Sequence, residues 1–232
     1  MGSKWAPCGD DQEAAVRQEV PFVITISRQL GSGGACIGRK VATELGVHYA
    51  DRDILERAAR SLDVSEAHVE ACEETAPSFF QSALSAYSLG GPDWVCIAPL
   101  DVPSYVEVRE AESRAVLELA AVRSAVIVGR AGFHLLRSHP RHLSVFLHAD
   151  LAFRVQRIQE ICELSPQRAL ARIEETERAR GRYLEQLTGR PWTDAVQYDL
   201  SICTSSIGLD RAASLICALA RDRFGLGSAS AA

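Results

Sequence analysis

The sequence contains very little lysine. Of its 25 basic residues, only Lys4 and Lys40 are lysines, and the other 23 are arginines. Such a bias ordinarily reflects genomic composition. It nevertheless limits which residues of this chain could serve as a phosphate-binding lysine.

Long apolar runs and a regular cysteine framework are also missing. No run approaches the roughly 20 residues that span a bilayer, and the first 20 residues lack the apolar stretch of a secretory signal. The seven cysteines are odd in number and no two lie close together in sequence. That spacing argues against a disulfide framework and against a zinc ribbon. These features favour a reducing cytoplasm, and we expect no membrane association.

The charge balance is mildly acidic, with a net charge of -5 and no long basic block. A nucleic-acid-binding surface is therefore not expected. The 232 residues suffice for one sizeable core with a small appended lobe. We expect a single domain over residues 21–225, with flexible tails at 1–20 and 226–232. The oligomeric state is left open.

Short apolar segments alternate with helical patterns along the chain. This alternation predicts an α/β fold with an open parallel sheet and helices on both faces. In such sheets ligands bind beyond the carboxyl ends of the strands, so the residues after each strand deserve inspection. The predicted strands are 22–27, 47–50, 125–128, 142–148 and 199–204, and the main predicted helices are 35–45, 105–121, 151–162, 166–187 and 210–224.

A glycine-rich turn, ISRQLGSGGACIG at residues 26–38, joins the first strand to the first helix. Gly31, Gly33 and Gly34 allow a tight turn with inward-facing N–H groups, and the start of a helix adds partial positive charge. One glycine would usually suffice for a purely structural turn. The three glycines therefore predict a phosphate-binding loop.

The dinucleotide-binding pattern fits this loop only in part. Gly31 and Gly33 supply its G-x-G, but Cys36 stands at the third glycine position. Asp51 lies 20 residues past Gly31, where a ribose-binding acid would be expected. An equally good interpretation makes Asp51 the N-cap of the next helix.

The G-x-x-x-x-G-K-[ST] pattern also fits in part. With Gly33 as its second glycine, Arg28 replaces the first glycine and Gly34 replaces the lysine. Ala35 or Cys36 then stands where a hydroxyl would bind Mg²⁺. Lys40 lies too far into the helix to reach back to the loop.

Four segments in order resemble the cytidylate kinase-like family of nucleoside monophosphate kinases. They are ITISRQLGSGGACIGRKVATELGVHYADRDIL, AVIVGRAGFHLL, FLHADLAFRVQRI, and ETERARGRY followed by QYDLSICTS. The resemblance covers residues 20 to about 220. It implies a three-layer P-loop NTPase-type fold with a five-stranded parallel sheet, a helical nucleotide-monophosphate-binding lobe at 52–120 and a lid at 151–190.

The resemblance also implies an activity. We expect ATP-dependent phosphoryl transfer to a nucleoside monophosphate, with CMP or dCMP as the acceptor and with ATP and Mg²⁺ as cofactors. Such chemistry requires positive charge and positioning more than a covalent nucleophile, and the planar fork of arginine suits it.

Particular residues receive roles from the resemblance. Arg130 would bind the acceptor phosphate, Arg154 and Arg157 would form the lid-side pair, and Arg180 would close on the transferring phosphate. Arg28 is hypothesised to supply the charge of the missing lysine. Asp51 would lie on the substrate side. The expected ATP phosphate-binding residues are Gly31, Ser32, Gly33, Gly34, Ala35 and Cys36.

Departures from the family pattern support a second interpretation. The loop lacks its lysine and its hydroxyl, and Ala131 stands where the family has an acid after Arg130. Cys36 is a poor ligand for hard Mg²⁺, so water, Ser32 or the nucleotide would have to hold the metal. The alternative is a non-catalytic nucleotide-binding or sensor module of the same fold. A third possibility, a dinucleotide-dependent oxidoreductase, depends on Asp51 and the partial G-x-G.

Histidines cluster loosely in the second half of the chain. His139 and His142 are three apart, but Pro140 between them breaks helical spacing. We therefore interpret these histidines, with His134 and His148, as strand-edge residues rather than metal ligands.

Overall fold

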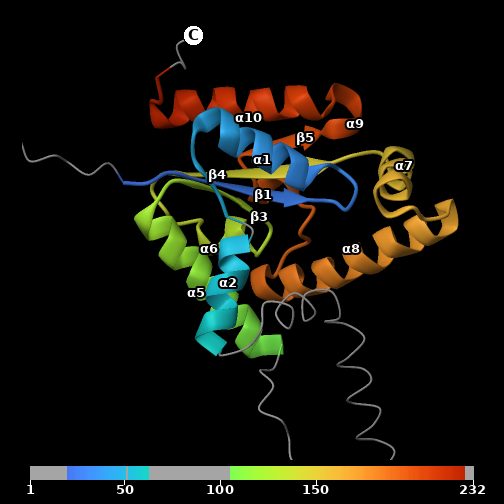
Figure 1. Ribbon diagram of the computed structural model, residues 1–232, viewed down its shortest axis with the longest axis horizontal. Helices are drawn as coiled ribbons and strands as arrows, with labels where there is room; N and C mark the ends of the chain where they lie inside the picture. The colour runs from blue at the N-terminus through green and yellow to red at the C-terminus, as the bar shows by residue number, and fades with distance from the viewer. Residues whose placement is uncertain (1–19, 51, 63–104, 228–232) are drawn as a thin grey trace, which may run out of the picture.

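The computed structural model describes residues 20–50, 52–62 and 105–227. Within these ranges the chain forms a five-stranded sheet flanked by helices (Figure 1). The strands are β1 (Val23–Arg28), β2 (His48–Tyr49), β3 (Ala125–Val128), β4 (His142–His148) and β5 (Leu200–Cys203). The α-helices are α1 (Gly34–Leu45), α2 (Arg52–Leu62), α5 (Tyr105–Val122), α6 (Gly132–Leu135), α7 (Leu151–Cys162), α8 (Pro166–Thr188), α9 (Thr204–Ile207) and α10 (Leu209–Phe224), with a 3₁₀ turn η1 at Ala195–Gln197.

The sheet has the strand order β2-β3-β1-β4-β5, and every neighbouring pair is parallel. β1 is the central strand, with β3 on one side and β4 on the other. Chain connections leave in opposite directions around β1, which makes its carboxyl end the switch point where ligands bind in open α/β sheets. In the dinucleotide-binding order 3-2-1-4-5-6, strand 2 lies beside strand 1. This topology therefore does not support the oxidoreductase interpretation.

Helices cover both faces of the sheet because its strands are apolar on both sides. Ile24 and Ile26 of β1 pack in the cluster shared with α1 and α10, whereas Val23 packs with α5 and with Ile54 of α2. Figure 1 shows α1 and α10 on one side of the sheet and α2, α5, α6 and α8 on the other. The result is the predicted three-layer α/β arrangement.

The predicted strands and long helices are confirmed with small shifts at their ends. β2 is shorter than expected, with two residues in place of four. The short helices α6 and α9 and the turn η1 were not predicted. The interior of the expected monophosphate-binding lobe, residues 63–104, lies outside the described residues, as do Asp51 and most of the two expected tails.

No helix in the described ranges is both long enough and apolar enough to cross a membrane. Four cysteines lie in these ranges, and all four are free: Cys36, Cys162, Cys203 and Cys217.

Candidate phosphate-transfer site

The loop between β1 and α1 takes a shape that requires its glycines. Gly31 and Gly33 have φ angles of 86° and 88°, which residues with a Cβ rarely adopt. A Cβ on Gly31 would lie 2.8 Å from the backbone oxygen of Arg154, so helix α7 approaches the loop closely. α1 begins with no side-chain cap, and the N–H groups of its first turn, from Gly34 to Cys36, are therefore available to an anion.

Ser32 and Thr204 hold this loop in place. The Ser32 hydroxyl is fully buried and donates to the carbonyl oxygens of Gln29, at 2.8 Å, and Leu147, at 3.3 Å. Its backbone N–H also donates to Gln29. The buried Thr204 hydroxyl, at the start of α9, donates to the Ser32 carbonyl at 2.9 Å. Both donors of the predicted phosphate ligand Ser32 thus serve the shape of the loop in this structure.

Arg28 occupies the space beside the position that aligns with the phosphate-binding lysine. A Cβ on Gly34 would lie 2.6 Å from Cγ of Arg28, and a Cβ on Gly129 would lie 2.2 Å from its Nη1. The Arg28 side chain therefore extends from the start of α1 to the residue that follows β3. The absence of a side chain at Gly34 therefore leaves the space that the Arg28 side chain occupies.

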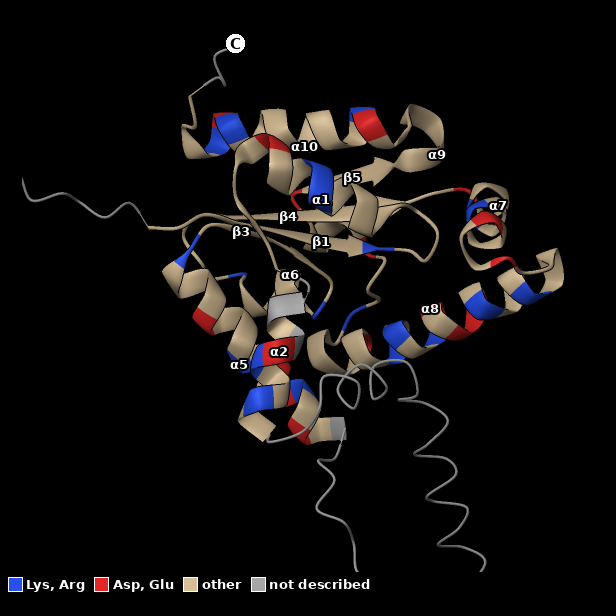
Figure 2. Cartoon of the chain, in the orientation of Figure 1, with Lys and Arg blue, Asp and Glu red and all other residues tan. Residues whose placement is uncertain are grey.

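Arg180 brings a second guanidinium to the same place. Its Nη1 donates to the carbonyl oxygen of Arg28 at 2.6 Å, and its guanidinium lies over the Trp192 ring at 5.7 Å. Burial, and next the charge of Arg28, lower the pKa of Arg180 to about 9, which leaves it charged at neutral pH. Figure 2 shows basic residues at the end of β1 and along α8. An anion that binds here would relieve the repulsion between these two guanidinium groups.

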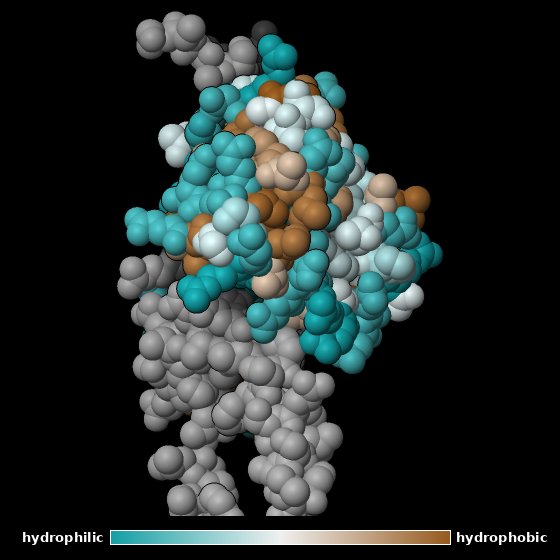
Figure 3. Space-filling view, turned by 90° about the vertical axis from the view of Figure 1, so that its right-hand side faces the viewer, coloured by the Kyte–Doolittle hydropathy of each residue, from teal (hydrophilic) through white to brown (hydrophobic). Residues whose placement is uncertain are grey.

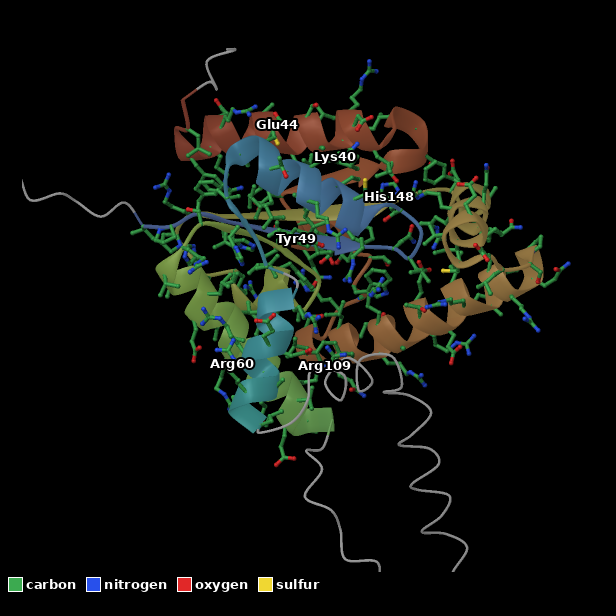
Figure 4. All side chains as sticks on the ribbon, viewed as in Figure 1. Lys40, Glu44, Tyr49, Arg60, Arg109 and His148 are labelled. Carbon is green, nitrogen blue, oxygen red and sulfur yellow. The ribbon has the colours of Figure 1, made fainter. Side chains whose placement is uncertain are left out.

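Arg130 lies in a buried ion-pair cluster that the sequence did not predict. Its Nη1 contacts one carboxylate oxygen of Glu112 on α5, and Arg109 donates to the other oxygen at 2.9 Å. The side chains of Arg130 and Glu112 are only 6% and 3% exposed, and burial raises the pKa of Glu112 against the opposing charge of Arg109. The Arg109 guanidinium also lies 4.7 Å from the centre of the Tyr183 ring on α8. Figure 4 labels Arg109 between α5 and the C-terminal half of α8.

The backbone around Arg130 is unusual as well. Arg130 and Ala131 have φ angles of 54° and 50°, in the left-handed region that non-glycine residues seldom occupy. Residues held in such conformations cluster at functional sites. The turn directs the Arg130 side chain toward α5, where Glu112 receives it.

The two arginines that were expected to act as a pair, Arg154 and Arg157, have different contacts in the structure. Arg154 is buried and connects α7 to its surroundings, with Nε donating to the Ala149 carbonyl at 3.0 Å and Nη1 contacting Glu177 of α8. Arg157 lies over the Phe153 ring at 5.9 Å. Its Nε is buried and has no hydrogen-bond partner among the described residues. Arg154 therefore positions α7 and α8, whereas the buried Nε of Arg157 is left without a hydrogen bond in the described part of the chain.

Lys40 does not take part in the site. It points from α1 to α10, where it forms an ion pair with Asp210 (Figure 4). The prediction that Lys40 cannot reach the loop is confirmed. Arg28 and Arg180 therefore lie at the start of the loop, whereas Lys40 does not.

The described residues are a poor fit for a protein-bound Mg²⁺ ion. They contain no group of three or more His, Cys, Asp or Glu side chains that could hold a metal. The Ser32 hydroxyl already donates within the protein, and the thiol of Cys36 is a soft ligand. Mg²⁺ generally keeps several waters and binds through substrate phosphates, so it would reach this site with the nucleotide.

An apolar area is visible on the end of the molecule where the strands have their carboxyl ends (Figure 3). It is surrounded by hydrophilic residues in this view. Near the loop, Leu209 packs against Gly33, and Leu30 packs against the small core between α7 and α8. A flat apolar ligand could therefore find contact area beside the glycine loop.

The fold and the glycine loop define the chain as a protein of the P-loop kinase-like class. The chain belongs to the cytidylate kinase-like family, whose model matches residues 23–206. Membership of this family supports nucleotide-dependent phosphoryl transfer as the general class of activity.

The chain shares its fold with one solved protein of unknown function, and its likeness to a second solved structure is weaker. An uncharacterized protein from Eubacterium ventriosum ATCC 27560 is 19% identical with a TM-score of 0.63, over 86% of this chain and 98% of that one. Shikimate kinase from Acinetobacter baumannii in complex with shikimate is 15% identical, with a TM-score of 0.49, over 87% and 93%. Among curated proteins, none matches this chain.

Proposed function

We propose that the protein transfers the terminal phosphoryl group of ATP to a nucleoside monophosphate, with CMP or dCMP as the acceptor. The observation that carries this proposal is the convergence of Arg28 and Arg180 at the start of the glycine loop. Two guanidinium groups beside free helix N–H groups are suited to the charge that develops on a transferring phosphoryl group.

In this proposal the loop holds the ATP phosphates through backbone N–H groups of Gly31, Gly33 and the first turn of α1, from Gly34 to Cys36. Arg28 takes the place of the absent lysine because its stem occupies the space beside Gly34. Arg180, delivered by α8, contacts the phosphoryl group in transfer. Arg157, also on the lid side of the site, contributes a further positive charge from α7.

The acceptor phosphate is assigned to Arg130 and Arg109, with Asp51 also on the acceptor side. Both arginines contact one carboxylate, that of Glu112, which fixes the orientation of two guanidinium forks. A phosphate can receive hydrogen bonds from such forks in the bidentate manner that arginine favours. This part of the proposal depends on the family resemblance for its acceptor class.

One observation favours a second candidate, a module that binds a nucleotide without transferring phosphate. The Arg130 side chain is 6% exposed and already paired with Glu112, so its availability to an acceptor requires movement. The lack of a loop hydroxyl for Mg²⁺ points in the same direction. Binding without turnover would then be the complete activity.

The deciding experiment measures ADP release from ATP and Mg²⁺ with CMP, dCMP, UMP, AMP and GMP offered one at a time. The test variant is Arg130→Ala, which leaves the buried Glu112 carboxylate paired with Arg109. Arg123→Ala, an exposed arginine before β3, is the matched control. Turnover with CMP or dCMP that the test variant loses and the control keeps supports the kinase. A rise in melting temperature with ATP but no turnover supports the binding module.

A further inference from the structure

A cavity lies at the end of the sheet opposite to the glycine loop. Its volume is about 360 Å³, within the range of small-ligand sites. It opens beside the amino ends of β4 and β5, where Ser144 and Asp199 lie. Its walls are formed by Phe133, His134, Arg137, His139, His142, Ser144, Thr188, Arg190, Val196, Gln197, Asp199 and Arg223.

Basic side chains outnumber acidic ones around this cavity. Three arginines and three histidines line it, against one carboxylate, Asp199. Asp199 is already engaged, since one oxygen pairs with Arg223 at 2.9 Å and the other accepts from the Ser144 N–H and hydroxyl at 2.8 Å. Those contacts lower the pKa of Asp199 against the effect of burial, which keeps it ionised and committed to them.

Arg137 and Arg190 are left as the cations of the cavity. Neither forms an ion pair with any residue in the described ranges. They come from different parts of the chain, after α6 and after α8, and both line the same space. Cations of separate segments that face one cavity are arranged to contact a single anion from two sides.

The histidines add donors whose geometry is partly fixed. His142 is held in place by a 2.7 Å contact between its Nε2 and the Thr25 hydroxyl. His139 Nδ1 accepts from the Arg141 N–H at 3.3 Å, so its Nε2 carries the proton when the ring is neutral. His134 lies beside Arg137, whose charge adds to burial in lowering the pKa of His134. An anion in the cavity would oppose that effect.

We propose that this cavity binds a compact anion with two or more negative charges, carried by phosphate or carboxylate groups. Arg137 and Arg190 provide the charge, and His134 and His139 provide hydrogen-bond donors. The site is separate from the glycine loop because β4 starts at the cavity, with His142, and ends at the loop, where the Leu147 carbonyl accepts from Ser32. The proposal does not depend on the activity proposed above.

Histidine ring signals in NMR spectra test this proposal because they report on each end of β4 separately. His134 and His139 report on the cavity, whereas His148, at the carboxyl end of β4, reports on the end where the loop lies (Figure 4). Pyrophosphate and citrate are titrated in turn into the wild-type protein and into Arg137→Ala/Arg190→Ala. The control is Arg114→Ala/Arg123→Ala, which removes two exposed arginines away from the cavity.

With one or both anions, the His134 and His139 signals are expected to move and the pKa of His134 to rise in the wild type and the control. The Arg137→Ala/Arg190→Ala protein is expected to bind at least about tenfold more weakly, because two charge-assisted contacts are lost. A response to pyrophosphate alone assigns a phosphate ligand, and a response to citrate alone assigns a carboxylate. Three results would overturn the proposal: movement of the His148 signal alone, no movement of any of these signals, or equal binding by the wild type and by Arg137→Ala/Arg190→Ala.

Discussion

At the scale of single residues, Arg28 and Gly34 compete for one space. The stem of Arg28 lies where a side chain at position 34 would have to begin, 2.6 Å from the Cβ that Gly34 lacks. A lysine at the usual position of a phosphate loop and an arginine at position 28 are therefore mutually exclusive in this backbone. The loop retains its positive charge by moving it to the end of β1.

This exclusion predicts a non-additive pair of substitutions. Gly34→Lys alone is expected to lower the free energy of unfolding by about 2 kcal/mol through overpacking. The double variant Arg28→Ala/Gly34→Lys should lose less free energy of unfolding than the sum of the losses in the two single variants. The difference, which is the coupling energy, should be at least about 1 kcal/mol. Denaturant unfolding of the four proteins measures this coupling.

Ala35→Lys is the matched control for that cycle, because Ala35 is exposed and directly follows Gly34 in α1. The same charge is introduced one residue further along α1. If Ala35→Lys couples to Arg28→Ala as strongly as Gly34→Lys does, the effect is electrostatic and the steric explanation is wrong.

His142 makes stability depend on pH. The pKa of His142 is lowered to about 4, and burial of the ring is the largest cause of this shift. The Nε2 atom of His142 contacts the Thr25 hydroxyl at 2.7 Å. The unfolded chain takes up the proton near pH 6.5, well before the folded protein does. The stabilising contribution is therefore complete above pH 6.5 and is lost as the pH falls toward 4.

Between pH 7 and pH 4.5 we expect His142 to account for a loss of about 2 kcal/mol in the free energy of unfolding. The His142→Gln protein keeps an amide for Thr25 but has no titrating group at this position. Its free energy of unfolding should therefore fall by about 2 kcal/mol less than that of the wild type over the same pH interval. Denaturant unfolding at both pH values, without polyvalent anions in the buffer, gives the comparison. Parallel losses in the two proteins would show that other groups cause the acid sensitivity.

At the scale of secondary-structure elements, α8 is held against the sheet by an aromatic cluster. Phe146 of β4 contacts Trp192 edge-on at a centroid distance of 5.6 Å and stacks on Tyr198 at 5.0 Å. Leu184 of α8 packs into the same cluster, and Gly181 lets the helix approach the Trp192 ring. The lid expected over residues 151–190 stays a prediction, and within that range Leu184 of α8 packs on Phe146 and Trp192.

The cluster also positions Arg180, so its loss should affect nucleotide binding. Trp192→Ala is expected to lower the free energy of unfolding by about 3 kcal/mol. It should also weaken ATP binding several-fold, because Arg180 loses the ring beneath its guanidinium. Unfolding experiments and calorimetric titration with ATP measure the two effects.

Leu184→Ala is the control, since it opens the same cluster without removing the ring under Arg180. It should reduce stability by a similar amount and leave the affinity for ATP nearly unchanged. Equal loss of ATP affinity in both variants would mean that general loosening of α8, and not the position of Arg180, controls binding.

At the scale of the whole molecule, the parts that the sequence predicted are those with a long local pattern. The buried strands β1, β3 and β4 are recognisable as continuous apolar runs, and the helices α1, α8 and α10 extend over enough residues to show their period. α6 and α9 have four residues each, which is too short for a helical period, and β2 has two. The glycine loop was recognisable because its glycines are adjacent in sequence.

The contacts around the candidate site could not be predicted, because their partners are far apart in the chain. Glu112 and Arg130 are 18 residues apart, and Thr204 and Ser32, which share a hydrogen bond, are 172 residues apart. No local pattern distinguishes Glu112 from the exposed glutamates of the same helix. The position of Thr204 could have helped, because this residue directly follows β5. It therefore lies at the carboxyl ends of the strands, where the loop also lies.

The placement of Lys40 has a chemical consequence. With its amine paired to Asp210 on the far side of α1, the region around the loop contains no lysine among the residues of known position. Acylation of amines, by acetylating enzymes or by laboratory esters, therefore has no target there that would neutralise the charge of the loop. Reagents that condense with guanidinium groups should inactivate the protein instead, and bound ATP should slow them. Arginine in place of lysine would make the proposed phosphate site insensitive to a modification that neutralises lysine-containing loops.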